Sequence, residues 1–156
     1  MYNFYKAEYN PNNLTGQVGG SSTTINLSGY LGELFPRVDA PPTESDRVYT
    51  QYRKIFIKNE YDSTSNNTRL WLDAEQHRGQ IAIAVQTGVS YSITSGSVEP
   101  TGISSWANPQ NYANGLEIGT LTANSITGVW VRQTLTSITE PDPFVSLRLH
   151  IGGILE

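Results

Sequence analysis

From Ile55 onward, apolar residues recur at every second position of this chain. Successive side chains of a β-strand point to opposite faces of a sheet, so this spacing indicates half-buried strands, and helical spacing is hard to find. The pattern is clearest near the end, where Val145, Leu147, Leu149 and Ile151 alternate with Phe144, Ser146, Arg148 and His150. The sequence therefore predicts an all-β fold.

Turn-forming residues separate the apolar runs into short segments. The predicted strands are 52–58, 69–74, 80–86, 115–121, 128–135 and 144–151, with a weaker one near 89–93. The loop 62–67 predicts a hairpin between the first two of these. In the third, Ala82 and Ala84 share one face, which we expect to lie under a close neighbour.

Strands at this spacing, joined by turns, favour two antiparallel sheets packed face to face. We predict an antiparallel β-sandwich, jelly-roll-like, with a closed barrel as the alternative. The expected organisation is an extended N-terminal arm (1–24), a strand, turn and Pro-rich connector (25–47), and the sandwich domain (48–156).

The predicted arm carries four aromatic side chains before a flexible Asn-, Pro- and Gly-rich stretch. They are Tyr2, Phe4, Tyr5 and Tyr9. Two interpretations are open: the rings cover the domain's own sandwich, or they lie on a neighbouring subunit. Under the second, deletion of residues 1–12 leaves a folded domain that no longer binds its partner.

Charged residues make up only 15% of the chain and the net charge is -4. Phosphate binding needs clustered Lys and Arg, whereas the ten here are scattered, so we expect no nucleic-acid partner. The chain has no cysteine, and no run reaches the length of a membrane span. Residues 1–6 lack the pattern of a signal peptide, and we expect a soluble protein made without one.

The residues that could carry chemistry are better explained as surface or core groups. His77 and His150 are expected on the surface, and the carboxylates Asp73, Glu75, Glu99, Glu117 and Glu140 are read as solubilising charges. No serine lies in a nucleophile motif, and neither zinc-ligand spacing nor a calcium loop is found. We therefore expect neither an enzyme nor a cofactor. Trp71 and Trp130 are expected in the core or a subunit interface, and Trp106 in an exposed contact.

Several segments, taken in order, resemble a structural module of tailed-bacteriophage virion proteins. They are LGELFP (31–36), YRKIFIKN (52–59), LWL (70–72), EPTGI (99–103), GLEIGTL (115–121), GVWVRQT (128–134) and LRLHI (147–151). The resemblance spans roughly residue 25 to the end, with a longer loop before Asn67. In a chain of this size it implies a capsid decoration (cement) protein: a β-sandwich bound to the outside of the phage head, often as a homotrimer.

The resemblance implies the major capsid protein and the chain itself as partners, and assembly in the host cytoplasm. The predicted contact residues are Tyr2, Phe4, Tyr5, Tyr9, Trp106, Arg132 and Arg148. One alternative is a tail or fibre accessory protein that binds a host surface glycan through Trp106. A third hypothesis is a glycoside-acting enzyme with two carboxylates.

Overall fold

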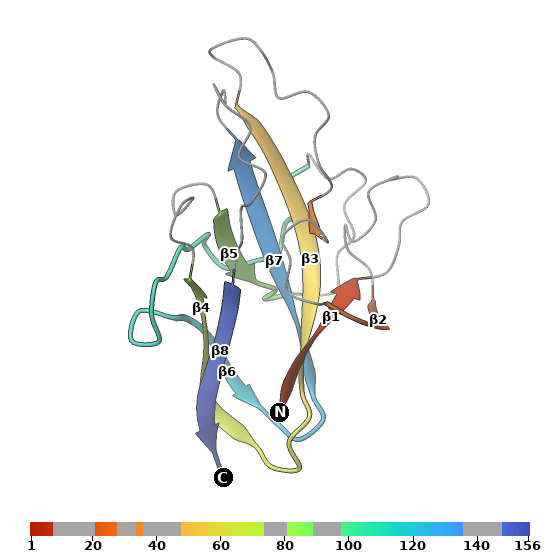
Figure 1. Cartoon of the computed structure of the whole chain (residues 1–156), viewed down its shortest axis with the longest axis vertical. Helices are drawn as coiled ribbons and strands as arrows, with labels where there is room; N and C mark the ends of the chain where they lie inside the picture. The colour runs from red at the N-terminus through yellow and green to blue at the C-terminus, as the bar shows by residue number, and fades with distance from the viewer. Residues whose placement is uncertain (8–20, 28–33, 36–47, 74–80, 89–97, 136–147) are drawn as a thin grey trace.

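The computed structural model describes residues 1–7, 21–27, 34–35, 48–73, 81–88, 98–135 and 148–156. Within these ranges eight β-strands form the regular structure (Figure 1). They are β1 (Tyr2–Ala7), β2 (Ser22–Asn26), β3 (Tyr49–Asn59), β4 (Ser65–Asp73), β5 (Ile81–Val85), β6 (Leu116–Leu121), β7 (Ile126–Leu135) and β8 (Arg148–Leu155). The all-β prediction is confirmed. The described residues hold no helix long and apolar enough to cross a membrane.

The strands form two antiparallel sheets. The larger has the order β2-β1-β3-β7-β5 and the smaller has the order β6-β4-β8. One apolar cluster joins them, with buried side chains from β3, β5 and β7 on one side and from β4 on the other. Its members are Ile55, Ile57, Ile81, Ile83, Val129 and Val131 from the larger sheet, Leu70 and Leu72 from the smaller, and Leu34 and Phe35. The two sheets thus share a core, as predicted, while jelly-roll connectivity stays a prediction.

The predicted hairpin between the strands around 55 and 71 is wrong. β3 pairs with β1 and β7, whereas β4 pairs with β6 and β8 in the other sheet. The chain crosses between sheets through residues 60–64, and Ile57 and Leu70 then share the same core cluster. Both arrangements give the same period-two pattern, because each strand still buries one face.

The predicted N-terminal arm is not confirmed, because residues 2–7 form a strand inside the larger sheet. β1 lies between β2 and β3, and its register with β3 runs from Tyr2 opposite Asn59 to Lys6 opposite Ile55. Phe4 packs against the shared core. Backbone pairing on both sides holds this segment, a constraint that its composition does not reveal. Tyr9 lies outside the described residues.

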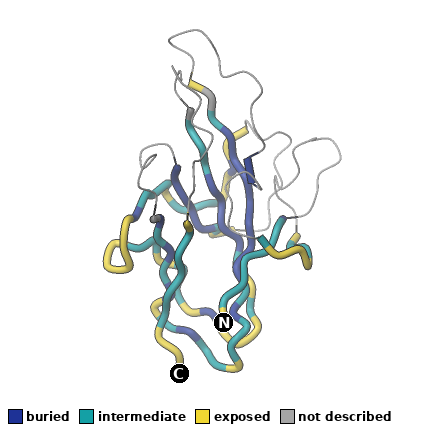
Figure 2. The backbone as a smooth tube through the Cα atoms, in the orientation of Figure 1, coloured by how far each residue is buried: buried dark blue, intermediate teal, exposed yellow. Residues whose placement is uncertain are grey.

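Burial is concentrated along the middle of β3, β5 and β7, while the turns and the end of β8 are exposed (Figure 2). The expectation for the alanine face of β5 is confirmed. Ala82 and Ala84 are both buried, opposite Arg132 and Trp130 of β7. The central strands of the larger sheet are therefore covered on both faces.

Candidate functional site

A cluster of aromatic and charged side chains lies on the face of the larger sheet that points away from the core. This Trp106 cluster consists of Tyr52, Glu99, Trp106 and Arg132. The Arg132 guanidinium lies 5.0 Å from the Trp106 ring, and the Tyr52 and Trp106 ring centroids are 5.6 Å apart. Trp106 Nε1 donates a 2.8 Å hydrogen bond to Glu99. Burial and the Glu99 carboxylate raise the pKa of Tyr52, while Arg132 opposes that shift.

Backbone contacts with β5 fix the position of Trp106. Ile83 and Ala107 exchange two hydrogen bonds of 2.8 and 2.9 Å, and the Ser104 amide donates to Val85. The segment therefore follows the outer edge of β5 without forming a regular strand. Trp106 then packs against Tyr52 and the fully buried Trp130. The structure thus brings together two predicted contact residues, Trp106 and Arg132, from segments far apart in the sequence.

A second cluster lies on the outward face of the smaller sheet. This Trp71 cluster consists of Arg69, Trp71, Tyr112 and His150. Trp71 and His150 are directly opposite on β4 and β8, and their rings stack at 5.4 Å with an interplanar angle of 9°. Tyr112 meets Trp71 edge-on at 5.7 Å, and the Arg69 guanidinium lies 5.7 Å from the Tyr112 ring.

Gly152 and the loop around Tyr112 allow the close packing of the Trp71 cluster. A Cβ at position 152 would stand 3.3 Å from the tip of the Trp71 ring and 3.5 Å from Tyr112. The Tyr112 hydroxyl donates to the Asn67 carbonyl, and Arg69 donates to the Ala113 carbonyl at 2.7 Å. Trp71 was expected in a core or subunit interface, and it lies half-buried on the outside of the sheet.

Two cations inside β3 are buried, a feature that the sequence analysis did not single out. Arg53 faces the core side, where it donates to the Leu34 and Tyr52 carbonyls and lies 5.5 Å from the Phe35 ring. Lys54 faces the other way and is fully buried, with its ammonium 4.7 Å from the Phe56 ring and 5.8 Å from Trp130. Removal from water lowers the pKa of Lys54 to about 8. The sequence signal for these buried cations is that Arg53 and Lys54 are adjacent and are followed directly by the apolar residues Ile55, Phe56 and Ile57.

Lys54 should make the protein more stable as the solution becomes mildly alkaline. Its folded pKa of about 8 lies below the ordinary 10.5, so the unfolded chain binds the proton more tightly between these values. The free energy of unfolding should rise on the order of 1–2 kcal/mol between pH 7 and 9.5. Urea titrations of wild type and Lys54→Met measure this, and the variant should lose the rise. Lys58→Met, on the same strand with a side chain 35% exposed, should keep it; a flat wild-type profile would contradict the prediction.

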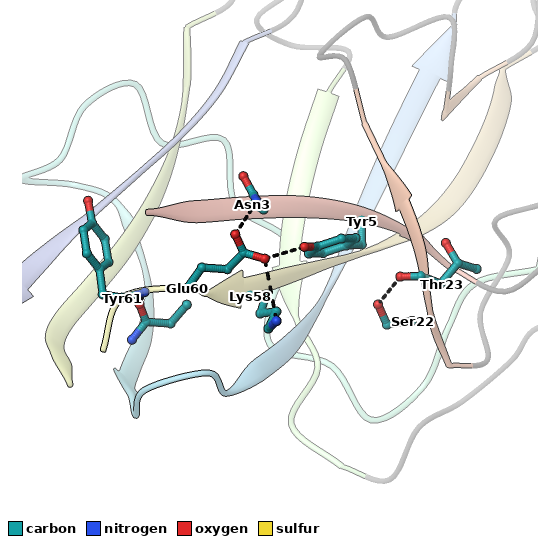
Figure 3. A network of polar contacts seen from close by, with 8 residues as sticks. Asn3, Tyr5, Ser22, Thr23, Lys58, Glu60 and Tyr61 are labelled. Atoms are coloured by element: carbon teal, nitrogen blue, oxygen red, sulfur yellow. Dashed lines mark hydrogen bonds and ion pairs between the residues drawn. The ribbon is translucent and has the colours of Figure 1, made fainter. Parts of the chain in front are cut away.

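A polar network around Glu60 joins β1 to the end of β3 (Figure 3). The Glu60 carboxylate accepts hydrogen bonds from Tyr5, at 2.5 Å, and from Asn3, and Lys58 lies 3.6 Å away. The Tyr5 hydrogen bond lowers the pKa of Glu60, and the same bond raises the pKa of Tyr5. Tyr2 bonds Ser65 of β4 and meets Tyr61 edge-on. Tyr2 and Tyr5 therefore make contacts within their own domain, in line with the first of the two interpretations of the aromatic segment.

The remaining predicted residues are spread over the molecule. Arg148 begins β8 and is exposed, on the sheet opposite Trp106. His150 lies on the outward face of β8, as expected, and is half-buried against Trp71. Glu99 and Glu117 are exposed. His77, Glu75 and Glu140 fall outside the described residues.

In the ranges that the structure describes, no group of three or more His, Cys, Asp or Glu side chains is arranged to hold a metal ion. Comparisons with protein family models, with curated proteins and with solved structures found no match for this chain.

Proposed function

We propose that this chain is a non-enzymatic structural protein of a phage particle, a decoration protein that binds the major capsid protein on the outer surface of the head. The observation that carries the proposal is the pair of aromatic and arginine clusters on the outward faces of both sheets. Outward faces of antiparallel sheets are usually solvated. Trp, Tyr and Arg are the residues enriched at the energetic centres of protein interfaces.

The resemblance and the surface composition add support. The segments that resemble the phage module include LWL (70–72) and GVWVRQT (128–134), which supply core residues and cluster residues alike. Few charges have to be desolvated when such a surface meets a partner. Repetition over a capsid lattice would multiply a modest contact. Jelly-roll connectivity and a homotrimeric state are part of this proposal.

Trp71→Ala and Trp106→Ala test the proposal in a binding assay with phage heads that lack the decoration protein. Loss of an interface tryptophan should weaken binding about 30-fold or more for at least one variant. Val98→Ala, which changes an exposed apolar residue outside both clusters, should bind like wild type. Circular dichroism verifies that each variant is folded. Wild-type affinity of both tryptophan variants, or no binding by the wild-type protein, would refute the proposal.

The second candidate is a tail or fibre accessory protein that binds a host surface glycan. One observation favours it: the Arg132 guanidinium lies over the half-buried Trp106 ring and Glu99 accepts from Trp106 Nε1, so a donor and an acceptor for a sugar lie next to an aromatic ring. The same variants applied to a glycan array separate the two functions. Glycan binding that is lost in Trp106→Ala and kept in Trp71→Ala, without capsid binding, would favour the second candidate.

A further inference from the structure

The edge strand β8 has few of the features that keep sheet edges from pairing. Edges in soluble proteins are usually protected by lysines, prolines, bulges, short length or covering segments. β8 has eight residues without lysine, proline or carboxylate, and its one charged residue, Arg148, lies at its first position. Among the described residues β8 pairs only with β4, with a register shift between Asn66 and Arg69 of β4. Near the end of β8, Ile154 and Leu155 are 56% and 44% exposed.

The other sheet edges differ from β8. The outer side of β5 is hydrogen-bonded to residues 102–107, and β2 has only five residues. β6 carries the exposed Glu117, and its pairing with β4 is irregular near Gly119, whose φ is +92°. Among the described edge strands, β8 is thus the longest and has the least protection.

We propose that β8 pairs antiparallel with β8 of a second copy of this chain and joins the two smaller sheets into one. The two-fold axis that relates the two copies is perpendicular to the joined sheet. Each residue of one β8 therefore lies opposite a residue of the other β8 whose side chain points to the same face of the sheet. Placing the axis at Gly152 sets Arg148 of each copy opposite Glu156 of the other. It also sets Leu149 opposite Leu155, and His150 opposite Ile154.

Charge and shape complementarity favour a second copy of β8 as the partner of this edge. Both Arg148 and Glu156 are exposed, so antiparallel pairing creates two ion pairs from one sequence. Gly152 and Gly153, at the centre, put no side chains in the way. The exposed Leu155 joins Leu149, which already packs against the core. The strand contact is smaller than the ~800 Å² per partner of a standard interface, so we expect a dissociation constant on the order of micromolar. The β8 pair is a two-fold contact between two copies, distinct from the three-fold contacts of the proposed homotrimer, and the inference does not depend on the proposed function.

Cysteine pairs test the alignment directly, because the native chain contains no cysteine. Arg148→Cys and Glu156→Cys proteins, distinguishable by a mass tag, are mixed under reducing conditions and then oxidised. Directly opposite residues have Cα atoms roughly 4.5–5.5 Å apart, within disulfide range. The mixture should therefore give a covalent dimer containing one copy of each variant. Alone, each variant should stay monomeric on a denaturing gel, since its two cysteines would lie about 27 Å apart.

Substitutions at the edge test the energetics of the same contact by analytical ultracentrifugation. Ile154→Lys should weaken self-association at least about tenfold, because it introduces an edge-protecting charge. Ile25→Lys is the matched control on β2, where the side chain is 57% exposed, and should not change association. Arg148→Glu and Glu156→Arg should each weaken the dimer, and the double variant should restore it.

A wild-type protein that stays monomeric at its highest soluble concentration would overturn the proposal. So would disulfides as abundant in either single-cysteine variant as in the mixture, or equal effects of Ile154→Lys and Ile25→Lys. Wild-type trimers that form no Arg148–Glu156 crosslink would likewise overturn it while leaving the proposed capsid function intact. If monomers of Ile154→Lys still bind capsids, capsid binding does not require the pairing of β8.

Discussion

Adding a single methyl group at Gly153 should destabilise this protein by about 2–3 kcal/mol, although the residue lies in an edge strand. A Cβ at this position would overlap Ser65 Oγ and stand 2.9 Å from Thr68 Oγ1 and 3.0 Å from the Tyr2 hydroxyl. Ser65 and Thr68 are fully buried and hydrogen-bonded to each other at 2.8 Å. The added carbon must therefore break a buried polar contact or displace a strand, because no open space remains.

Thermal and urea unfolding of Gly153→Ala measure this effect, with a fall in Tm of roughly 4–12 °C expected for a chain of this length. Gly152→Ala is the control, since its Cβ would meet only ring atoms at 3.3 Å or more, and it should lose less than about 1 kcal/mol. Combining Gly153→Ala with Ser65→Ala should cost less than the sum of the single changes, because the first clash is removed. Strict additivity would show that Ser65 is not the obstacle.

The alternation of apolar residues predicted most of the strands and the shared core. Ile55 and Ile57 face the core as their spacing indicates, and so do Ile81 and Ile83. These positions are predictable because burial of one strand face is the dominant favourable term in folding. Jelly-roll connectivity stays a prediction.

Pairing partners could not be predicted in the same way. Residues 52–58 and 69–74 read as a hairpin, yet they belong to different sheets, because periodicity records which face is buried and not which strand lies alongside. The aromatic residues of β1 read as a loose arm for a similar reason. Their partner is the edge of β3, more than forty positions away in the sequence.

The candidate site was partly predictable. Trp106 and Arg132 were expected to make contacts, and they lie together because residues 102–107 follow the edge of β5. The Trp71 cluster was missed because a tryptophan inside a strand pattern is more often buried. Trp71 lies between Leu70 and Leu72, which face the core, so the alternation of side chains along a strand places Trp71 on the outward face. This alternation can be read from the sequence.

Deleting residues 1–7 should unfold the domain or lower its Tm by more than about 10 °C, in contrast to the expectation from sequence that an N-terminal deletion leaves a folded protein. The deletion removes the ladder between β1 and β3, the core contact of Phe4 and the buried Ala7. With ladder hydrogen bonds worth about 1 kcal/mol each and the partly buried Phe4 side chain worth at most about 2 kcal/mol, the loss approaches the whole stability of a typical domain. Tyr5→Phe is the control, because it removes only the hydrogen bond to Glu60 and should lose far less stability than the deletion. Far-ultraviolet circular dichroism and thermal unfolding distinguish the outcomes, and a deletion variant as stable as Tyr5→Phe would show that β1 contributes little to the fold.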